Sequence, residues 1–577
     1  MHFVKKVPTS EEEKAVKRKE QEKKCKQFLH VRDIIVTKRE KNEYDDEMLS
    51  LTQQLLEKNC DIYTFWNIRR TAIELRITEN QKIQTNSEIS DEEKSKNSQK
   101  IENLLAGELF LSYECIKGNP KSYSAWYQRA WVLQRQTAPD YKKELALCEK
   151  ALQMDCRNFH CWDHRRIVAK MAKRTEQEEL EFSNKLIDEN FSNYSAWHYR
   201  SIALKNIHKN EETGSVRLSD ALISDELKKV RNAFYMDADD QSAWTYTRWL
   251  LENGSGKEFL RPDSTTPVEL ISASFHGNNT TLVFSRAITL PKVLSFVDSE
   301  EQTGWRAFSS MSPSPSSARV WQFLSDSPLR IAAPESTDTT WLSLTDKPYL
   351  NVPRLQTIFD VVEAKEPAYI AELLEDCKQL IELEPKNKWP LYMRTLVLLE
   401  YRPISYHSEI TSNLKSLSAD LDPKRAELYK SLLSRQNLNF SIREQFDRLI
   451  GSDNDELIVR YSELISLEGV EFLSGLVGSV DLSGNKLTEV HRIVLPNVQN
   501  LTINENPISS LSPSPALSNL QFLSIASTDI SDPYQILPFL QTTPSLNRLV
   551  FCETALVSKT EELRAQLPGV RLIPHWL

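Results

Sequence analysis

Several kinds of residue and segment are scarce in this sequence, and each shortage excludes a class of protein. The eight cysteines are scattered and include no Cys-x2-Cys pair, which argues against a zinc site built by this chain alone and against a disulfide scaffold. No stretch of about eighteen apolar residues occurs, so we expect no membrane insertion. The net charge of −9 gives no support for a nucleic-acid partner. Together these features predict a cytoplasmic protein with no metal site of its own.

Proline and glycine are unevenly distributed along the 577 residues. Residues 1–250 hold only three of the 26 prolines and three of the 13 glycines, which is typical of long helices. Beyond Gly254 come short β-type runs, TTLVFSRAI, KVLSFV and ARVWQFL, and helical character returns at about Pro353. We therefore predict a mainly α chain in four parts: helical hairpins at 1–253, an inserted β-sandwich-like (Ig-like) domain at 254–351, further helical hairpins at 352–450 and a leucine-rich-repeat domain at 451–577.

A tryptophan followed three to five residues later by an arginine recurs in the helical parts. The spacings of 36 and 35 residues between Trp126, Trp162 and Trp197 predict a solenoid of α-hairpins. We expect a serine two residues before the tryptophan to cap the second helix, the tryptophan to pack between hairpins, and the arginine to pair with an acidic group of the adjacent hairpin. The copies are centred on Trp66, Trp126, Trp162, Trp197 and Trp244, with a weaker one at Trp389.

A leucine-rich pattern, L-x-x-L-x-L-x-x-N-x-L, occupies the C-terminal part of the chain. Four copies in succession predict parallel strands in a separate stack, with a concave face suited to binding. The copies begin at Val477, Val498, Leu520 and Leu546, and a degenerate copy lies at Leu457.

One helical copy departs from the others, and such departures are more informative than agreement. His160 stands two residues before Trp162, where other copies have serine or threonine. Five residues before the tryptophan, two consecutive hairpins have a basic residue, Lys121 and Arg157, where the others do not. Stacked hairpins bring equivalent positions together, so these side chains would form a cationic cluster at helix N-termini, where a phosphate or diphosphate is a natural ligand. The open alternative is that Lys121 and Arg157 are solvated turn residues and His160 is a variant of the cap.

The hairpin sequences, particularly NPKSYSAW and RNFHCWDHRR, resemble the α subunits of the protein prenyltransferases over roughly residues 1–250 and 353–445. An inserted β domain followed by leucine-rich repeats is the plan of the type II class, the Rab geranylgeranyltransferases. The resemblance implies an enzyme subunit that wraps a prenyltransferase β subunit, which carries the catalytic zinc. It further implies geranylgeranyl diphosphate as co-substrate, C-terminal cysteines of Rab GTPases as acceptors, and a Rab escort protein that presents them.

The same resemblance assigns roles to individual residues. Lys121 and Tyr123 are expected to face the diphosphate of the isoprenoid donor, and Asn158 and His160 to lie against the same pocket. Lys121 and His160 are then the candidate catalytic residues of this chain, whereas isoprenoid length is set by the other subunit.

Two other functions stay open at this point. A helical scaffold with leucine-rich repeats that only binds proteins would give no reason for Lys121 and His160 to depart from the repeat. An α subunit of a farnesyl or type I geranylgeranyl transferase would leave residues 454–577 unexplained. A further hypothesis concerns His2, because a neutral imidazole near the N-terminus could reach the open position of the zinc in the partner subunit, although a disordered terminus is the simpler interpretation.

Overall fold

The computed structural model describes residues 11–210, 216–254, 268–276, 279–298, 303–308, 317–324, 329–332, 341–344, 349–359, 361, 363, 365–451, 455–490 and 493–575. The chain divides into two compact units, Met1–Ile207 and His208–Leu577, and each is described by itself. Among the helices in these ranges, none is both long enough and apolar enough to cross a membrane.

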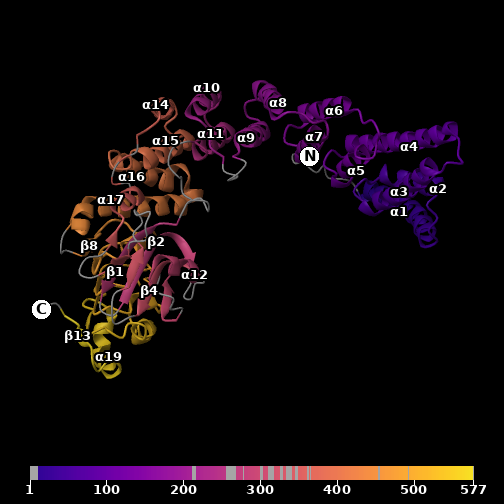
Figure 1. Cartoon of the computed structure of the whole chain (residues 1–577). Coiled ribbons are helices and arrows are strands. Elements are labelled where there is room, and N and C mark those ends of the chain that lie inside the picture. The colour runs from indigo at the N-terminus through magenta and orange to yellow at the C-terminus, as the bar shows by residue number, and fades with distance from the viewer. Residues whose placement is uncertain are drawn as a thin grey trace. The chain divides into compact units, whose positions relative to one another are not determined.

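The first unit is built from helical hairpins, and this confirms the mainly α fold predicted from the tryptophan repeat (Figure 1). Each second helix begins three residues before its tryptophan. The polar stretch 78–100 is exposed, yet most of it is helical, since it extends two neighbouring helices. The helices are α1 Glu11–Glu40, α2 Asp46–Leu56, α3 Tyr63–Thr85, α4 Asp91–Gly118, α5 Tyr123–Leu133, α6 Tyr141–Met154, α7 Phe159–Met171, α8 Glu176–Glu189 and α9 Tyr194–His208.

The repeated tryptophans are buried and fix the turn between the two helices of each hairpin. In every copy from Trp66 to Trp244 the indole N–H donates to the backbone carbonyl six residues earlier, at 2.8 or 2.9 Å. A buried indole needs such an acceptor. The tryptophan therefore has the structural role that its recurrence predicted.

The predicted cap position is wrong by two residues. The capping side chain stands four residues before the tryptophan, where Ser122 Oγ accepts the Ala125 N–H at 3.3 Å and Asn158 Oδ1 accepts the Cys161 N–H at 3.3 Å. The indole must reach back past the cap to the turn, so the tryptophan lies one turn into the helix. His160 is consequently not a variant of the cap.

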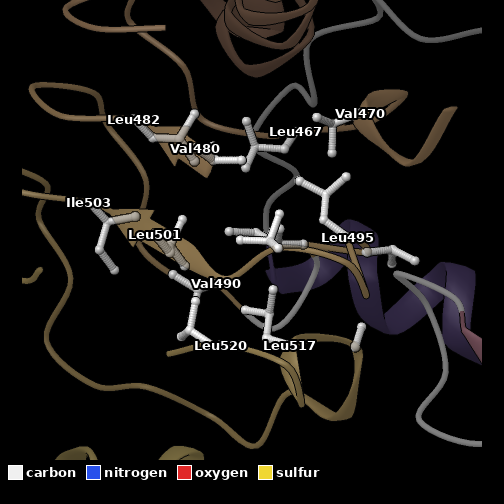
Figure 2. Close-up of a cluster of buried hydrophobic side chains, with 14 of the residues drawn as sticks. Leu467, Val470, Val480, Leu482, Val490, Leu495, Leu501, Ile503, Leu517 and Leu520 are labelled. Carbon is white, nitrogen blue, oxygen red and sulfur yellow. The ribbon is translucent and has the colours of Figure 1, made fainter. Parts of the chain in front are cut away.

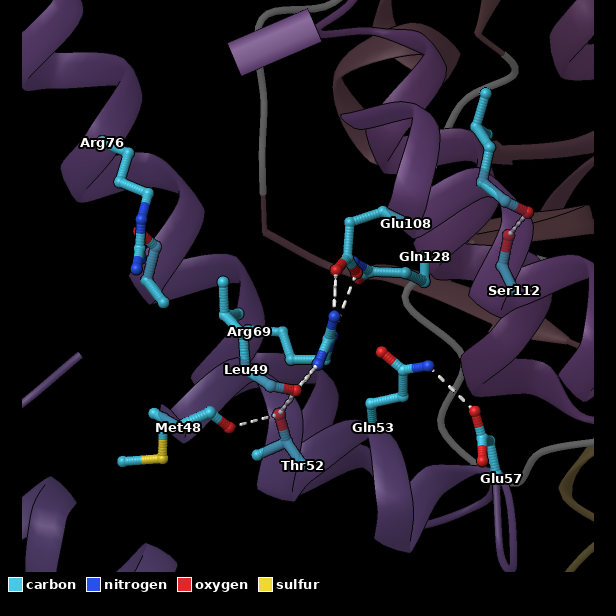
Figure 3. Close-up of polar contacts among 12 residues, drawn as sticks. Met48, Leu49, Thr52, Gln53, Glu57, Arg69, Arg76, Glu108, Ser112 and Gln128 are labelled. Carbon is cyan, nitrogen blue, oxygen red and sulfur yellow. Dashed lines mark hydrogen bonds and ion pairs between the residues drawn. The ribbon is translucent and has the colours of Figure 1, made fainter. Parts of the chain in front are cut away.

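The arginines that follow the tryptophans pair with glutamates of the next hairpin, as the sequence predicted. Each glutamate also accepts a hydrogen bond from a side chain two residues after the next tryptophan, and we call each such three-residue contact a seam. The seams are Arg69–Glu108–Gln128, Arg129–Glu144–His164 and Arg165–Glu179–Tyr199. All nine side chains lie at buried positions. Figure 3 shows Arg69 and Gln128 converging on Glu108 in the first seam.

In the second unit, the helical hairpins continue on both sides of the insertion. Helix α10 packs on α14, and the Arg231 guanidinium donates to Asp376 at 2.7 Å across this contact. The helices are α10 Asp220–Met236, α11 Gln241–Glu252, α13 Val352–Ile358, α14 Ala368–Leu383, α15 Lys388–Tyr401, α16 His407–Ser416 and α17 Ala426–Gly451.

The insertion contains an antiparallel sheet in the order β3-β4-β2-β1-β7 and a two-stranded sheet, β5-β6. Ile331 of the small sheet packs in one apolar cluster with Leu282 and Trp321 of the large one, which gives a sandwich-like core. The strands are β1 Leu270–His276, β2 Asn279–Thr289, β3 Trp305–Phe308, β4 Ser317–Leu324, β5 Arg330–Ala332, β6 Trp341–Ser343 and β7 Tyr349–Leu350. The predicted strand KVLSFV is instead helical, as α12 Leu290–Val293 and a 3-10 turn, because Pro291 lies in its first turn.

The C-terminal repeats form a parallel sheet with one short strand in each copy, in the order β13-β12-β11-β10-β9-β8. The central residue of each strand is an apolar side chain in register with its neighbours, from Leu457 through Val480 to Leu549. A sixth strand centred on Leu572 was missed from the sequence because the pattern is cut short there. The elements are β8 Glu456–Ile458, β9 Ser479–Asp481, β10 Asn500–Thr502, β11 Phe522–Ser524, β12 Arg548–Val550 and β13 Arg571–Ile573, with helices α18 Leu537–Leu540 and α19 Thr560–Gln566.

The parallel sheet does not form the separate stack that the sequence predicted. One apolar core contains Ile271 and Val283 from the inserted sheet, Phe446 from α17, and the repeat residues Val480 and Leu501. Figure 2 shows the repeat part of this core, including Val480 and Leu501. Polar contacts cross the same junction, since the Asn497 amide donates to Ser274 Oγ at 2.9 Å. The insertion and the repeats therefore share a core in which neither can be removed without exposing the other.

Candidate functional site

The candidate site lies at the start of α5 and α7, the second helices of two consecutive hairpins. Lys121 belongs to the turn before α5, and both neighbouring hairpins hold this turn. Asn119 Oδ1 accepts the Lys121 N–H at 3.2 Å, and Asn119 Nδ2 donates to Asp61 of the preceding hairpin at 2.9 Å. The Pro120 carbonyl accepts a hydrogen bond at 2.9 Å from the Asn158 amide of the following hairpin. The backbone at Lys121 is therefore held from both sides while its side chain is exposed.

His160 lies in the first turn of α7, and aromatic rings from both hairpins surround it. The ring centroids of Tyr123 and His160 are 4.2 Å apart with the planes at 87°, and Phe159 lies 3.9 Å from the imidazole. The residue His160 is only 6% exposed, whereas Tyr123 is 70% and Phe159 is 51% exposed. The structure thus brings together the four residues that the sequence analysis singled out, and adds Phe159 to them.

The surroundings of His160 favour the neutral imidazole. Burial lowers the pKa of His160 below its ordinary value of 6.5, and the nearby charge of Lys121 lowers it further. The carboxylates of Asp163 and Asp61 oppose this shift without reversing it. At neutral pH the ring therefore carries one N–H donor and one acceptor nitrogen.

Lys121 has no counterion within the described part of the chain. Its ammonium group makes no hydrogen bond or ion pair with the residues that the structure describes, and the same holds for the exposed side chain of Arg157 before α7. Lys121 stands before α5 and Arg157 before α7, and at each helix start the helix dipole adds to the positive charge, which makes it a positive region. Such a region favours an anion with several oxygens.

Asn158 holds the site together rather than facing outward. It is 3% exposed, its Oδ1 accepts the His160 N–H at 3.1 Å, and its Nδ2 makes the bond to the Pro120 carbonyl described above. Sequence reasoning missed Asp61 and Asn119, which position Lys121. A signal was available, since an Asn or Asp recurs seven residues before each of the first five tryptophans and accepts the N–H two residues on.

The cysteine and the second histidine of RNFHCWDHRR have structural positions. Cys161 is buried and donates to the Cys148 carbonyl at 3.4 Å, and His164 belongs to a seam. In the ranges that the structure covers, no group of three or more His, Cys, Asp and Glu side chains could hold a metal ion. His2, the possible ligand to a partner's zinc, lies outside the described residues.

Comparison with known proteins identifies the repeat. The family model for the protein prenyltransferase alpha subunit repeat matches residues 105–136, 141–172, 176–207 and 223–254. Each match covers part or all of a first helix and all, or all but the last residue, of a second helix. The "Geranylgeranyl transferase type-2 subunit alpha" of Sus scrofa is 32% identical over 610 residues, which cover 99% of this chain and 100% of that protein. The chain belongs to the geranylgeranyl transferase type-2 α-subunit family.

Members of this family differ in length. The protein of the same name from Dictyostelium discoideum is 35% identical over 279 residues, which are 83% of its length but only 47% of this chain. That relative is therefore much shorter than this chain. A solved structure of "Candida albicans protein geranylgeranyltransferase-I complexed with GGPP" matches 75% of this chain and 95% of that chain at 15% identity, and its TM-score of 0.41 is too low to support an argument.

Proposed function

We propose that this chain is the α subunit of a heterodimeric enzyme that transfers geranylgeranyl from geranylgeranyl diphosphate to C-terminal cysteines of Rab GTPases. The family name supports the geranylgeranyl group and the subunit type. In this proposal the β subunit carries the catalytic zinc, a Rab escort protein presents the acceptor, and the enzyme acts in the cytoplasm. The chain alone is inactive, because it supplies only one side of the donor pocket.

One observation carries the proposal at the level of chemistry: the unpaired ammonium of Lys121 beside the neutral imidazole of His160. Transfer of an isoprenoid releases diphosphate, and negative charge grows on its oxygens as the carbon–oxygen bond breaks. A fixed cation and a hydrogen-bond donor at that position stabilise the transition state more than the ground state. Lys121 supplies the charge and His160 the donor.

The aromatic side chains at the site are suited to the apolar part of the donor pocket, next to the diphosphate. Tyr123 and Phe159 expose ring surface next to the proposed diphosphate position, where a first isoprene unit or an apolar side chain of the partner can pack. Tyr63 and Tyr194 occupy the equivalent position, three residues before the tryptophan, in the hairpins on either side, and both are exposed. This row of rings is a surface suited to contact with the β subunit.

The proposal is tested by measuring how the heterodimer binds inorganic diphosphate, the released product. We expect Lys121→Ala to weaken this binding about ten- to a hundredfold, because a charge-assisted hydrogen bond contributes roughly 1.5–3 kcal/mol. Lys117→Ala is the matched control, since Lys117 is an exposed lysine one turn earlier that faces Glu114. Equal affinity in the wild-type and Lys121→Ala complexes would show that the site does not bind diphosphate.

A further inference from the structure

The position four residues after the tryptophan holds an arginine in three of the helical copies, namely Arg70, Arg166 and Arg248. Two of them have a carboxylate on their own helix. The Arg166 guanidinium donates to Asp163 at 2.6 Å, and that of Arg248 donates to Glu252 at 2.7 Å. Arg70 differs, because the residue three positions before it is Asn67, where Arg166 has Asp163.

The partners of Arg70 in the first unit are neutral. Its guanidinium donates to the Asn67 amide oxygen and, at 3.0 Å, to Gln128 Oε1. The closest carboxylate in this network is Glu108, but its oxygens already accept hydrogen bonds from Arg69 and from Gln128 (Figure 3). Glu108 therefore pairs with Arg69, and Arg70 is left without a counterion among the described residues.

Arg70 lines an open groove of about 490 Å³ between α3 and α5. The lining is partly apolar, since it includes Leu75, which is 52% exposed, and Trp131. The ring of Tyr127, which is 62% exposed, lies beside the Arg70 guanidinium, with its centroid 4.9 Å away. The one carboxylate in the groove, Glu74, is held by Arg135 at 2.6 Å. Burial lowers the pKa of Arg70, and the charge of Arg135 acts in the same direction. The groove thus presents a partly desolvated cation framed by apolar surface.

We infer that this groove is a docking site for the partner subunit of the proposed transferase, and that a carboxylate of that subunit pairs with Arg70. The inference rests on the proposed function. A carboxylate fits because the planar guanidinium binds it through two parallel hydrogen bonds, and the apolar lining excludes water from the pair. A partly buried arginine without a counterion is unfavourable in the free chain, so the partner's carboxylate adds affinity when the complex forms.

The first test measures the dissociation constant of the purified heterodimer by diluting it to nanomolar concentration and counting complexes by mass photometry. We expect Arg70→Gln to raise the dissociation constant at least tenfold, because the partner's carboxylate is then buried without a cation. Asn67→Asp should act in the same direction with no contact removed, since it supplies Arg70 with the counterion that Arg166 already has. Arg166→Gln is the matched control and should leave the dissociation constant within about twofold.

The second test identifies the partner's carboxylate directly. Arg70→Lys keeps a positive charge in the groove and places a primary amine there, so a carbodiimide should form an amide between this lysine and the partner's acidic side chain. Mass spectrometry of the cross-linked complex is expected to show one peptide pair between the subunits, and Arg166→Lys is expected to show none.

The outcomes separate this inference from the proposed function. If Arg70→Gln and Asn67→Asp leave the dissociation constant unchanged and the complex still transfers geranylgeranyl, the docking inference is wrong and the proposed function stands. If the wild-type chain forms no complex with a prenyltransferase β subunit, both are wrong. A cross-link from Arg70→Lys to this chain alone also overturns the docking inference.

Discussion

The seams and the tips belong to the same repeat, where the tips are the starts of α5 and α7 with Lys121 and His160. Residue differences between copies have opposite meanings in these two places. In the seams, Gln128, His164 and Tyr199 differ in type but perform one task, which is to donate a hydrogen bond to a buried glutamate. At the tips, Lys121 and His160 replace residues of other types: the Lys121 ammonium has no partner among the described residues, and His160 packs against the rings of Tyr123 and Phe159. Variation that preserves a contact is structural, whereas variation that leaves a cation exposed and unpaired indicates a ligand.

The largest effect on stability is expected from a substitution in a seam. We expect Glu144→Ala to lower the free energy of unfolding by about 3–5 kcal/mol, because it leaves Arg129 and His164 buried without their acceptor. Urea unfolding of the chain, followed by circular dichroism, measures the loss. Glu149→Ala, which removes a surface ion pair with Lys185, should change stability by less than about 0.5 kcal/mol. Equal losses in both variants would contradict the structural role of the seam.

The pH dependence of stability also tests the structural role of Glu144 in its seam. Burial raises the pKa of Glu144, but hydrogen bonds from His164 and Arg129 outweigh this and lower it from 4.5 to about 2. A carboxyl group with a lowered pKa in the folded state stabilises the protein above pH 4.5, and this contribution is lost as the pH falls from 4.5 towards 2. Compared with wild type, Glu144→Gln should therefore lose roughly 3 kcal/mol less stability over that range. Parallel curves for the two proteins would refute the assignment.

A change at the tips should have a smaller effect on free energy and none on folding. Lys121→Ala is expected to lower kcat/KM of the heterodimer about ten- to a hundredfold, which corresponds to the roughly 1.5–3 kcal/mol of a charge-assisted hydrogen bond. The melting temperature should not change, because the Lys121 ammonium has no partner within the described ranges. A lower melting temperature with unchanged kinetics would reverse the distinction between tips and seams.

The smallest expected effect is that of His160. Its neutral ring offers one hydrogen bond worth about 1 kcal/mol, so His160→Ala should lower kcat/KM roughly fivefold and His160→Gln, which keeps an N–H donor, should lower it less. Because burial and Lys121 lower the pKa of His160, the wild-type rate should not depend on its protonation between pH 7 and 8. A rate that falls tenfold across this interval in wild type, but not in His160→Gln, would contradict the neutral imidazole.

The sequence predicted the parts of the fold that depend on one repeated contact. The spacing of Trp126, Trp162 and Trp197 located the hairpins because each indole makes the same bond to its own turn. The cap position was misplaced, since serine is common both at caps and inside the first turn. The strand KVLSFV was wrong because a short apolar run does not distinguish a strand from a buried helix once Pro291 lies in its first turn.

The candidate site was predictable only in part. Lys121 and His160 could be found because they differ from their equivalents, whereas Tyr123 was found only through the resemblance to the prenyltransferase α subunits; the structure shows that the three lie together. Asn119 was visible in the sequence as a recurring residue of the turn, but its side-chain hydrogen bond to Asp61 crosses between hairpins, and no single-copy pattern reveals that contact. The shared core of the insertion and the C-terminal repeats was also beyond the sequence, because Ile271 and Val480 are far apart in the chain and each fits its own local pattern.

Reconstitution of geranylgeranyl transfer tests the central claim most directly. The full chain, a Rab-type prenyltransferase β subunit and the two together are each incubated with radiolabelled geranylgeranyl diphosphate and a Rab GTPase bound to its escort protein. We predict thioether-linked label on the Rab protein only when both subunits are present, and at least tenfold less with Lys121→Ala. Label transferred by this chain alone, or a fully active pair carrying Lys121→Ala, would contradict the account.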